Sequence, residues 1–132
     1  MKAIARRAGR KGLKHTVEMG AHRLTADEPQ DQGGTDRGPS PQELLAASLA
    51  SCSAATMEMY ATRRGWDIGE VVVKVIYEPA QRGSPTKFRM DVSLPKELSE
   101  EQREKLMQIV AKCPVHRTLE GEVCFEENLE LT

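Results

Sequence analysis

Residues 41–64 read PQELLAASLASCSAATMEMYATRR, and this stretch decides how the rest of the chain is organised. Alanine, leucine, methionine and glutamate are strong helix formers, and no glycine or proline interrupts the run after Pro41. Apolar and small residues recur every three or four positions and so share one side of a helix: Leu45, Leu49, Cys52, Thr56 and Met59. The sequence therefore predicts one helix of roughly 36 Å, with the Cys52 thiol at its middle.

Both ends of this helix carry the residues that helix ends favour. Ser40 suits the N-cap, Pro41 suits the first turn, and Glu43 lies near the positive end of the helix dipole. Gly65 is placed to end the helix. Most of its circumference is apolar or small, which is more than one sheet face can cover, so a second subunit is expected.

Composition sets the class of protein. The chain has 132 residues, enough for a single domain over 1–132 with its own core. Hydrophobic residues make up 39%, aromatic residues only 4%, and the net charge is −1. A core of aliphatic residues and methionine is expected, and this charge argues against a nucleic acid or an anionic membrane as a partner.

The chain shows no membrane-spanning segment and no secretory leader. No apolar run approaches the roughly 18 residues of a span, which predicts a cytoplasmic protein. Three cysteines (Cys52, Cys113 and Cys124) without a CxxC pair do not form a secreted disulfide framework. In a reducing compartment each is a buried small hydrophobe, a metal ligand or a redox centre.

Alternating and β-branched segments predict strands around the long helix. They cover residues 2–7, 13–19, 22–25, 71–77, 87–94 and 123–129. Residues 29–39, PQDQGGTDRGP, have no periodicity and predict a loop. The order of elements indicates an α+β fold, with an antiparallel sheet packed on the long central helix and on a second helix.

The second helix is predicted from Glu100 to about Lys112. Ser99 and Gln102 form a capping box, and Leu106, Ile109 and Val110 with Met107 form the apolar face. Pro114 ends this helix and suits the first turn of a short helix to Leu119, closed by Gly121. Cys113 then lies at a cap, beside free N–H groups, where the pKa of a thiol is lowered.

The residues alone leave the role of the cysteines open. Cys52 on an alanine-rich helix either packs or reacts, and Cys124 in a strand is expected to be structural. His116 follows Cys113 by three residues, but no second pair has metal-ligand spacing. We therefore predict no metal site and no cofactor.

Two motifs in order, GPSPQELLAASLASC and CPVHRTL, resemble the family of the osmotically inducible protein C and the organic hydroperoxide resistance protein. The resemblance covers nearly the whole chain. HRLTADEP and CPVHRTLEGE are similar to a branch other than the best-known peroxidases. The resemblance to the family implies an intertwined homodimer with two active sites at the subunit interface. It also implies a thiol peroxidase that reduces organic hydroperoxides with electrons from a dithiol such as a lipoyl group.

Site residues follow from the resemblance position by position. Cys52 matches the peroxidatic cysteine, and Cys113 matches the resolving cysteine. The family's catalytic arginine lies in the first hairpin turn, where this chain has Arg10, and Arg37 is the substitute. A peroxidatic cysteine reacts as thiolate, so a cation within about 4–6 Å is expected to lower the pKa of Cys52, and Arg117 is a third candidate for that role.

One position departs from the family pattern. The family has a glutamate directly after the proline that opens the central helix, paired with the arginine, and this chain has Gln42. Glu43 projects about 100° away on the helix and does not replace it. This departure favours the alternative function, a non-enzymatic small-molecule or redox-sensing binder on the same dimeric fold.

Overall fold

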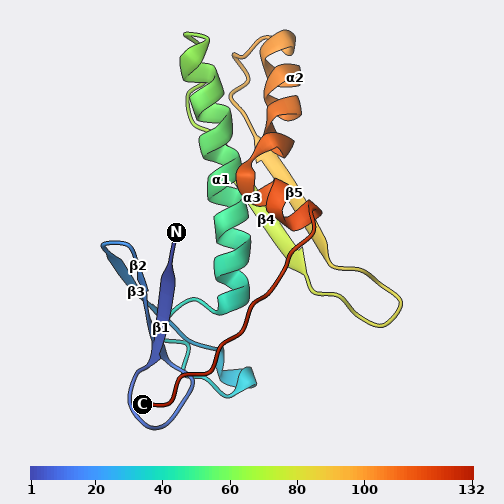
Figure 1. The fold of residues 1–132 in the computed structure, drawn as a ribbon. Helices are drawn as coiled ribbons and strands as arrows, with labels where there is room; N and C mark the ends of the chain where they lie inside the picture. The colour runs from blue at the N-terminus through green and yellow to red at the C-terminus, as the bar shows by residue number, and fades with distance from the viewer. The chain divides into compact units, whose positions relative to one another are not determined.

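A computed structural model describes residues 1–132. Its elements, in chain order, are β1 (Ala3–Arg7), β2 (His15–Met19), β3 (His22–Ala26), η1 (Gln30–Gln32), α1 (Pro41–Arg63), β4 (Val72–Glu78), β5 (Lys87–Ser93), α2 (Glu100–Ile109), η2 (Val110–Lys112) and α3 (Pro114–Glu120) (Figure 1). The strands form two sheets, β1-β2-β3 and β4-β5. The predicted α+β class is confirmed.

The chain forms two compact units, each built from two separate stretches. Residues 1–47 and 77–88 make up the first unit, and residues 48–76 and 89–132 make up the second. The expectation of one domain over 1–132 stays a prediction.

The first unit contains a three-stranded antiparallel sheet close to the one predicted. β1 pairs with β2 from Ala3 opposite Met19, and β2 pairs with β3 from Met19 opposite His22. Glu18 on the middle strand meets an arginine from each neighbour, Arg6 and Arg23, at 2.9 Å. Both arginines are exposed, so solvent screening leaves each pair only a small contribution to stability.

Asp27, which the sequence did not single out, organises the loop that follows β3. Its side chain is only 2% exposed and accepts four hydrogen bonds. The donors are the backbone N–H groups of Glu28, Thr35 and Arg37 and the hydroxyl of Thr35. The Thr35 hydroxyl, helped by these N–H groups, outweighs burial and lowers the pKa of Asp27 to about 2.

Helix α1 begins and ends as predicted. The Glu43 N–H donates to the Ser40 hydroxyl at 3.1 Å, and the Ser40 N–H donates to the Glu43 carboxylate at 3.0 Å. At the other end Gly65 has a φ of +69°, and the Trp66 N–H bonds back to the Ala61 carbonyl at 2.9 Å. This left-handed glycine lets the last carbonyls find donors.

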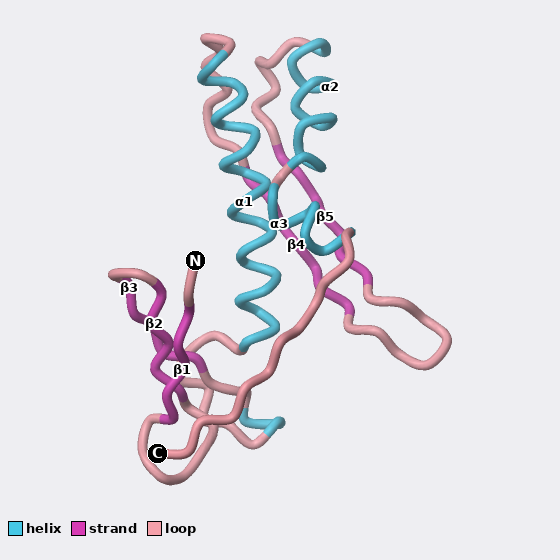
Figure 2. Tube along the Cα trace, viewed as in Figure 1, coloured by secondary structure: helices cyan, strands magenta, loops and turns pink.

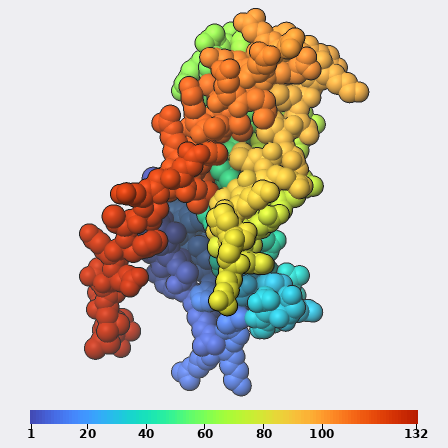
Figure 3. All heavy atoms as spheres, turned by 90° about the vertical axis from the view of Figure 1, so that its right-hand side faces the viewer, coloured from blue at the N-terminus to red at the C-terminus, as the bar shows by residue number.

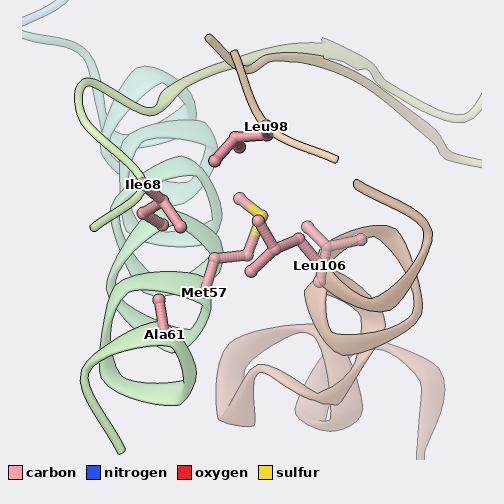
Figure 4. Close-up of a cluster of buried hydrophobic side chains, with 6 residues drawn as sticks. Met57, Ala61, Ile68, Leu98 and Leu106 are labelled. Atoms are coloured by element: carbon pink, nitrogen blue, oxygen red, sulfur yellow. The ribbon is translucent and has the colours of Figure 1, made fainter. Parts of the chain in front are cut away.

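The core of the second unit lies between α1, α2 and the segments around β4 and β5. Figure 4 shows Met57 and Ala61 on α1 facing Leu106 on α2, with Ile68 and Leu98 closing the cluster. Apolar burial of this kind contributes about 25 cal/mol per Å², so these contacts hold α2 against α1.

The predicted buried side of α1 is wrong in part. The fully buried residues are Leu49, Ser53, Met57 and Ala61, spaced by four. Met59, expected to be buried, is 51% exposed. Apolar and small residues occur around most of the circumference of this helix, so hydrophobicity alone does not distinguish one face from another, and packing against α2 selects the buried row.

Helix α2 follows its sequence signals closely. The reciprocal capping bonds between Ser99 and Gln102 are both present. Leu106 and Ile109, with Val110 just after the helix, are buried, whereas Met107 is exposed. The chain tightens into the 3₁₀ turn η2 before Pro114 opens α3, which confirms the predicted break.

The predicted strand over 123–129 is not formed. Residues after Gly121 have no regular structure, as the loop colouring after α3 shows in Figure 2. Their atoms lie at the surface as the red C-terminal end of the chain in Figure 3, with Phe125 82% and Leu129 87% exposed. Cys124 is exposed too, which corrects its expected structural place in a strand. A strand needs a hydrogen-bonded neighbour, and here it has none.

No helix of the chain is long and apolar enough to cross a bilayer.

Acid should reveal the contribution of Asp27 to stability. Its pKa of about 2 in the folded protein lies below the ordinary 3.8. Its hydrogen bonds therefore stabilise the fold fully above about pH 4, and this stabilisation is lost as the pH falls through about 2. Asp27→Asn should lower the thermal midpoint at neutral pH by roughly 5 °C, measured by circular dichroism, and should remove this part of the acid dependence.

Asp31→Asn is the matched control, because Asp31 is exposed in the same loop. It should change the midpoint little. Equal midpoints for Asp27→Asn and Asp31→Asn at neutral pH would contradict the role given to Asp27.

Candidate functional site

Two cysteines far apart in the chain meet in the second unit. Cys52 lies at the middle of α1, and Cys113 directly precedes α3. Their side chains are within hydrogen-bonding reach of one another. Packing of α2 on α1 brings them together, because the core residues Met57 and Leu106 anchor the two helices beside this point.

The local sequence fixes the conformation of Cys113. A proline disfavours the helical conformation in the residue before it, and Cys113 is extended, with φ −60° and ψ 137°. It is therefore the N-cap of α3, and the His116 N–H donates to its sulfur at 3.3 Å. Cys113 is fully buried.

Cys52 has a different environment. Its side chain is half-buried. The backbone N–H of Val115, in the first turn of α3, is within reach of its sulfur. The Thr56 hydroxyl bonds to the Cys52 backbone carbonyl at 2.7 Å, one helical turn away.

These environments shift the pKa values of the two thiols in opposite directions. Burial and the hydrogen bond with Cys113 raise the pKa of the Cys52 thiol. Burial also opposes ionisation of Cys113, but hydrogen bonds from the Cys52 thiol and the His116 N–H outweigh it and lower the pKa of Cys113. The pKa of Cys113 is thus lowered and the pKa of Cys52 is raised, and the two thiols titrate as a pair.

The expected lowering of the Cys52 pKa by a cation is therefore not what this chain shows. The leading influences on the Cys52 pKa are burial, the Cys113 thiol and the Val115 N–H, and none is a positive charge. The predicted lowering of the Cys113 pKa at the cap, in contrast, agrees with the structure.

Ser53 is the site residue that sequence reasoning missed. It is fully buried, and its hydroxyl adjoins the Cys113 sulfur, where it helps to lower the pKa of that thiol. The missed signal is a serine at spacing four between Leu49 and Met57, in the buried row of α1. A polar residue in such a row needs a partner, and Cys113 is the neighbour available.

The three candidate arginines lie in different places. Arg10 is in the loop between β1 and β2, and Arg37 is in the loop before α1, so both belong to the first unit. The backbone N–H of Arg37 is held by Asp27. Arg117 is in the same unit as the cysteines, exposed on α3. Whether any of them acts on Cys52 stays a prediction.

Gln42 and Glu43 have distinct roles at the start of α1. Glu43 is engaged in the helix cap through the Ser40 N–H. Gln42 is exposed and borders a surface hollow of the first unit together with Glu28 and Asp31. The cap explains why Glu43 does not take the place of the family glutamate.

The chemistry of the pair is that of two thiols. No three His, Cys, Asp or Glu side chains of the chain gather as a metal site requires. His116 Nδ1 lies 3.1 Å from Glu120, away from the sulfurs along α3. Two neighbouring thiols, of which one ionises readily, can form and break a disulfide.

Comparison with known proteins gives a family model and several structures. The model described as OsmC-like protein matches residues 33–128. A structure from Psychrobacter arcticus, described as an osmotic stress induced and detoxification response protein, is 22% identical with a TM-score of 0.75; the match covers 89% of this chain and 87% of that one.

Two further structures have the same fold. An OsmC-like protein of Mycoplasma pneumoniae is 21% identical, with a TM-score of 0.68, covering 91% of this chain and 85% of that one. OhrB, an organic hydroperoxide resistance protein of Bacillus subtilis, is 23% identical, with a TM-score of 0.60, covering 91% and 90%. No curated protein matches the sequence. At these identities the structural likeness shows the fold.

The contact between the sulfurs leads to a test by oxidation. Diamide should join Cys52 to Cys113 in a disulfide, because the thiols already lie side by side, and peptide mass spectrometry should find the linked pair. Cys124→Ser should form the same disulfide at an unchanged rate, since Cys124 is exposed in the C-terminal segment. Preferential linkage of Cys124 to either of the other two cysteines within one chain would contradict the pairing.

Proposed function

Because this chain belongs to the OsmC-like family, we propose that it is a cysteine-based thiol peroxidase that reduces organic hydroperoxides. Cys52 is the peroxidatic cysteine, and Cys113 is the resolving cysteine. The observation that carries the proposal is the contact between these two thiols, formed by residues 61 positions apart (113 − 52) in the printed sequence.

Access supports this assignment of roles. Cys113 is fully buried within its own chain, whereas Cys52 is half-buried. A peroxide therefore reaches Cys52 more readily. Cys113 needs to reach only the sulfur of Cys52, which is already its neighbour.

The reaction balances with these two sulfurs and one peroxide. The Cys52 sulfur attacks one oxygen of ROOH, the O–O bond breaks, and the alkoxide leaves and takes a proton, which yields ROH and a sulfenic acid on Cys52. The Cys113 sulfur then attacks the Cys52 sulfur, water leaves, and a disulfide forms. The cycle closes when a dithiol, such as a lipoyl group, reduces the disulfide.

The raised pKa of Cys52 is compatible with this role. If Cys113 ionises first, transfer of the Cys52 proton to Cys113 leaves the negative charge on Cys52. A thiolate derived from a thiol of higher pKa is also the stronger nucleophile. The Cys113 thiolate is then the proton acceptor at the start of the reaction.

Several similar structures bear descriptions as organic hydroperoxide resistance proteins, which supports an organic peroxide as the substrate. Arg10 is our candidate for the cation that completes the site, with Arg37 and Arg117 as substitutes. All three cysteines are free thiols, which suits a reducing compartment, and we place the protein in the cytoplasm.

A second function, a redox-sensing binder without turnover, is favoured by one observation. The pKa is lowered at the buried Cys113 and raised at the more accessible Cys52, so the thiol that a peroxide can reach is the one that ionises less readily. Oxidants would convert such a pair slowly to a disulfide. The protein would then consume about one peroxide per chain, even with excess dithiol present.

We propose further that the working form is a homodimer. Large apolar side chains remain at the surface of the single chain, and apart from Met1 those of the C-terminal segment are the most exposed: Val123, Phe125, Leu129 and Leu131. Their alternation with polar residues suits a strand that pairs with another chain. Burial of these side chains would supply the apolar area that a stable dimer needs.

Substitution of each cysteine tests the peroxidase. With cumene hydroperoxide and a dithiol in excess, Cys52→Ser should abolish peroxide consumption, because the attacking sulfur is absent. Cys113→Ser should slow repeated turnover and leave Cys52 as sulfinic acid, which intact mass spectrometry detects.

Cys124→Ser is the control and should consume peroxide at the wild-type rate. Unchanged consumption by Cys52→Ser would sink the peroxidase assignment. A wild-type protein that consumes only one equivalent of peroxide would favour the redox-sensing binder.

The dimer can be tested at the C-terminal segment. Phe125→Asp should weaken self-association by roughly tenfold or more, measured by sedimentation velocity over a range of concentrations, because it places a charge where an apolar contact is proposed. Asn128→Asp adds the same charge at a polar position and should change association little. Equal association for the two variants would contradict the contact.

A further inference from the structure

Ser53 has a buried hydroxyl that the peroxidase reaction above does not use. The side chain is fully buried, and its oxygen has no hydrogen-bond partner in the reduced protein. A buried hydroxyl without a partner destabilises the fold, so a position like this needs an explanation.

The usual local partner is not taken. Serine and threonine within helices commonly donate to the carbonyl one turn earlier. Thr56 and Thr62 on the same helix do so, at 2.7 and 2.9 Å. Ser53 does not, and its hydroxyl instead adjoins the sulfur of Cys113.

A thiol and a thiolate are different partners for this hydroxyl. A neutral thiol is a weak acceptor, which fits the absence of a hydrogen bond to the Ser53 hydroxyl in the reduced protein. A thiolate accepts strongly, and the hydroxyl would then complete its hydrogen bond. Ser53 is therefore unsatisfied until charge develops on Cys113.

The two sulfurs also differ in access. Cys113 is fully buried within a single chain, and a second subunit could only add to that burial. Cys52 is half-buried, so a small thiol entering the site meets its sulfur first. The sulfur that is harder to reach is thus the one with the Ser53 hydroxyl and the His116 N–H beside it.

We propose that a thiol reductant attacks the disulfide at the Cys52 sulfur and expels Cys113, and that Ser53 is a positioning residue that donates a hydrogen bond to Cys113 as it leaves. The inference rests on the Cys52–Cys113 pairing of the proposed function.

The electrons balance as follows. The reductant thiolate forms a bond to Cys52, the Cys52–Cys113 bond breaks, and its electron pair goes to Cys113 as a thiolate. With a dithiol, the second thiol loses its proton to solvent and attacks the reductant sulfur held on Cys52. Cys52 leaves with an electron pair, and the reductant departs as a cyclic disulfide. In thiol–disulfide exchange, the sulfur whose thiol has the lower pKa is the better leaving group. This favours departure of Cys113 over departure of Cys52.

The site of attack can be measured directly. Cys124→Ser protein is oxidised with diamide, mixed briefly with 2-mercaptoethanol, quenched in acid, unfolded and alkylated with N-ethylmaleimide. Peptide mass spectrometry should find mercaptoethanol on Cys52 and maleimide on Cys113. The reverse distribution, or an even one, overturns the inference.

The role of Ser53 needs its own comparison. Ser53→Ala, in the same background, should slow disulfide reduction roughly three- to tenfold, because a hydrogen bond to the leaving charge is lost. Ser51→Ala is the matched control, one serine earlier on α1 and exposed, and should reduce at the parental rate. Equal rates for the two variants overturn the role of Ser53.

A second readout separates this role from packing. In a Cys52→Ser, Cys124→Ser background, ultraviolet thiolate absorbance reports the titration of Cys113 alone. Ser53→Ala should move this titration to higher pH, while Ser51→Ala should not. An unmoved titration also overturns the role, whatever the effect on the unfolding midpoint.

A failure of this inference can be distinguished from a failure of the proposed peroxidase function. Diamide forms the disulfide without a peroxide, so the direction of its reduction is measured even if cumene hydroperoxide is not consumed. Conversely, attack at Cys113 would reject the inference and leave peroxide consumption by Cys52 unaffected.

Discussion

The contact between the sulfurs of Cys52 and Cys113 is the constraint on which the rest of the site depends. Neither cysteine is reactive by its own position, because one lies within a helix and the other is fully buried. The apolar contact of Met57 with Leu106 holds the two helices together. Pro114 then interrupts the helical segment directly after Cys113, so a core contact and a helix break together produce the pair of neighbouring thiols.

Burial and hydrogen bonding make the two thiols of this pair different. A pair of equivalent thiols would share its charge equally, but only Cys113 combines full burial with the His116 N–H and the Ser53 hydroxyl. Charge is favoured at the inner sulfur, and access is favoured at the outer one. Oxidants and reductants are then both expected to act on Cys52, while Cys113 exchanges electrons only with its neighbour.

Local signals in the sequence predicted the elements well, and nonlocal packing accounts for what they missed. The capping box of Ser99 and Gln102 and the stop at Gly65 depend on adjacent residues, and both were predicted. The buried row of α1 depends on which face meets α2, so Met59 was misplaced. The pairing of Cys52 with Cys113 came from family resemblance, since no rule of spacing joins residues so far apart. Ser53 was missed for the same reason.

Residues 123–129 have the sequence pattern of a strand, but no other strand of the chain is available to pair with them. Alternation of Val123 and Phe125 with polar residues is a sheet pattern, yet no strand of the same chain pairs with it. An apolar, unpaired segment of this kind is suited to pairing with a neighbouring chain, which is the basis of the proposed homodimer. A second copy could then restrict the entrance to Cys52, but it could not expose Cys113, because that sulfur is already enclosed by its own chain. Dimerisation would therefore leave unchanged the enclosure of Cys113 and the hydrogen bond that its own chain gives it.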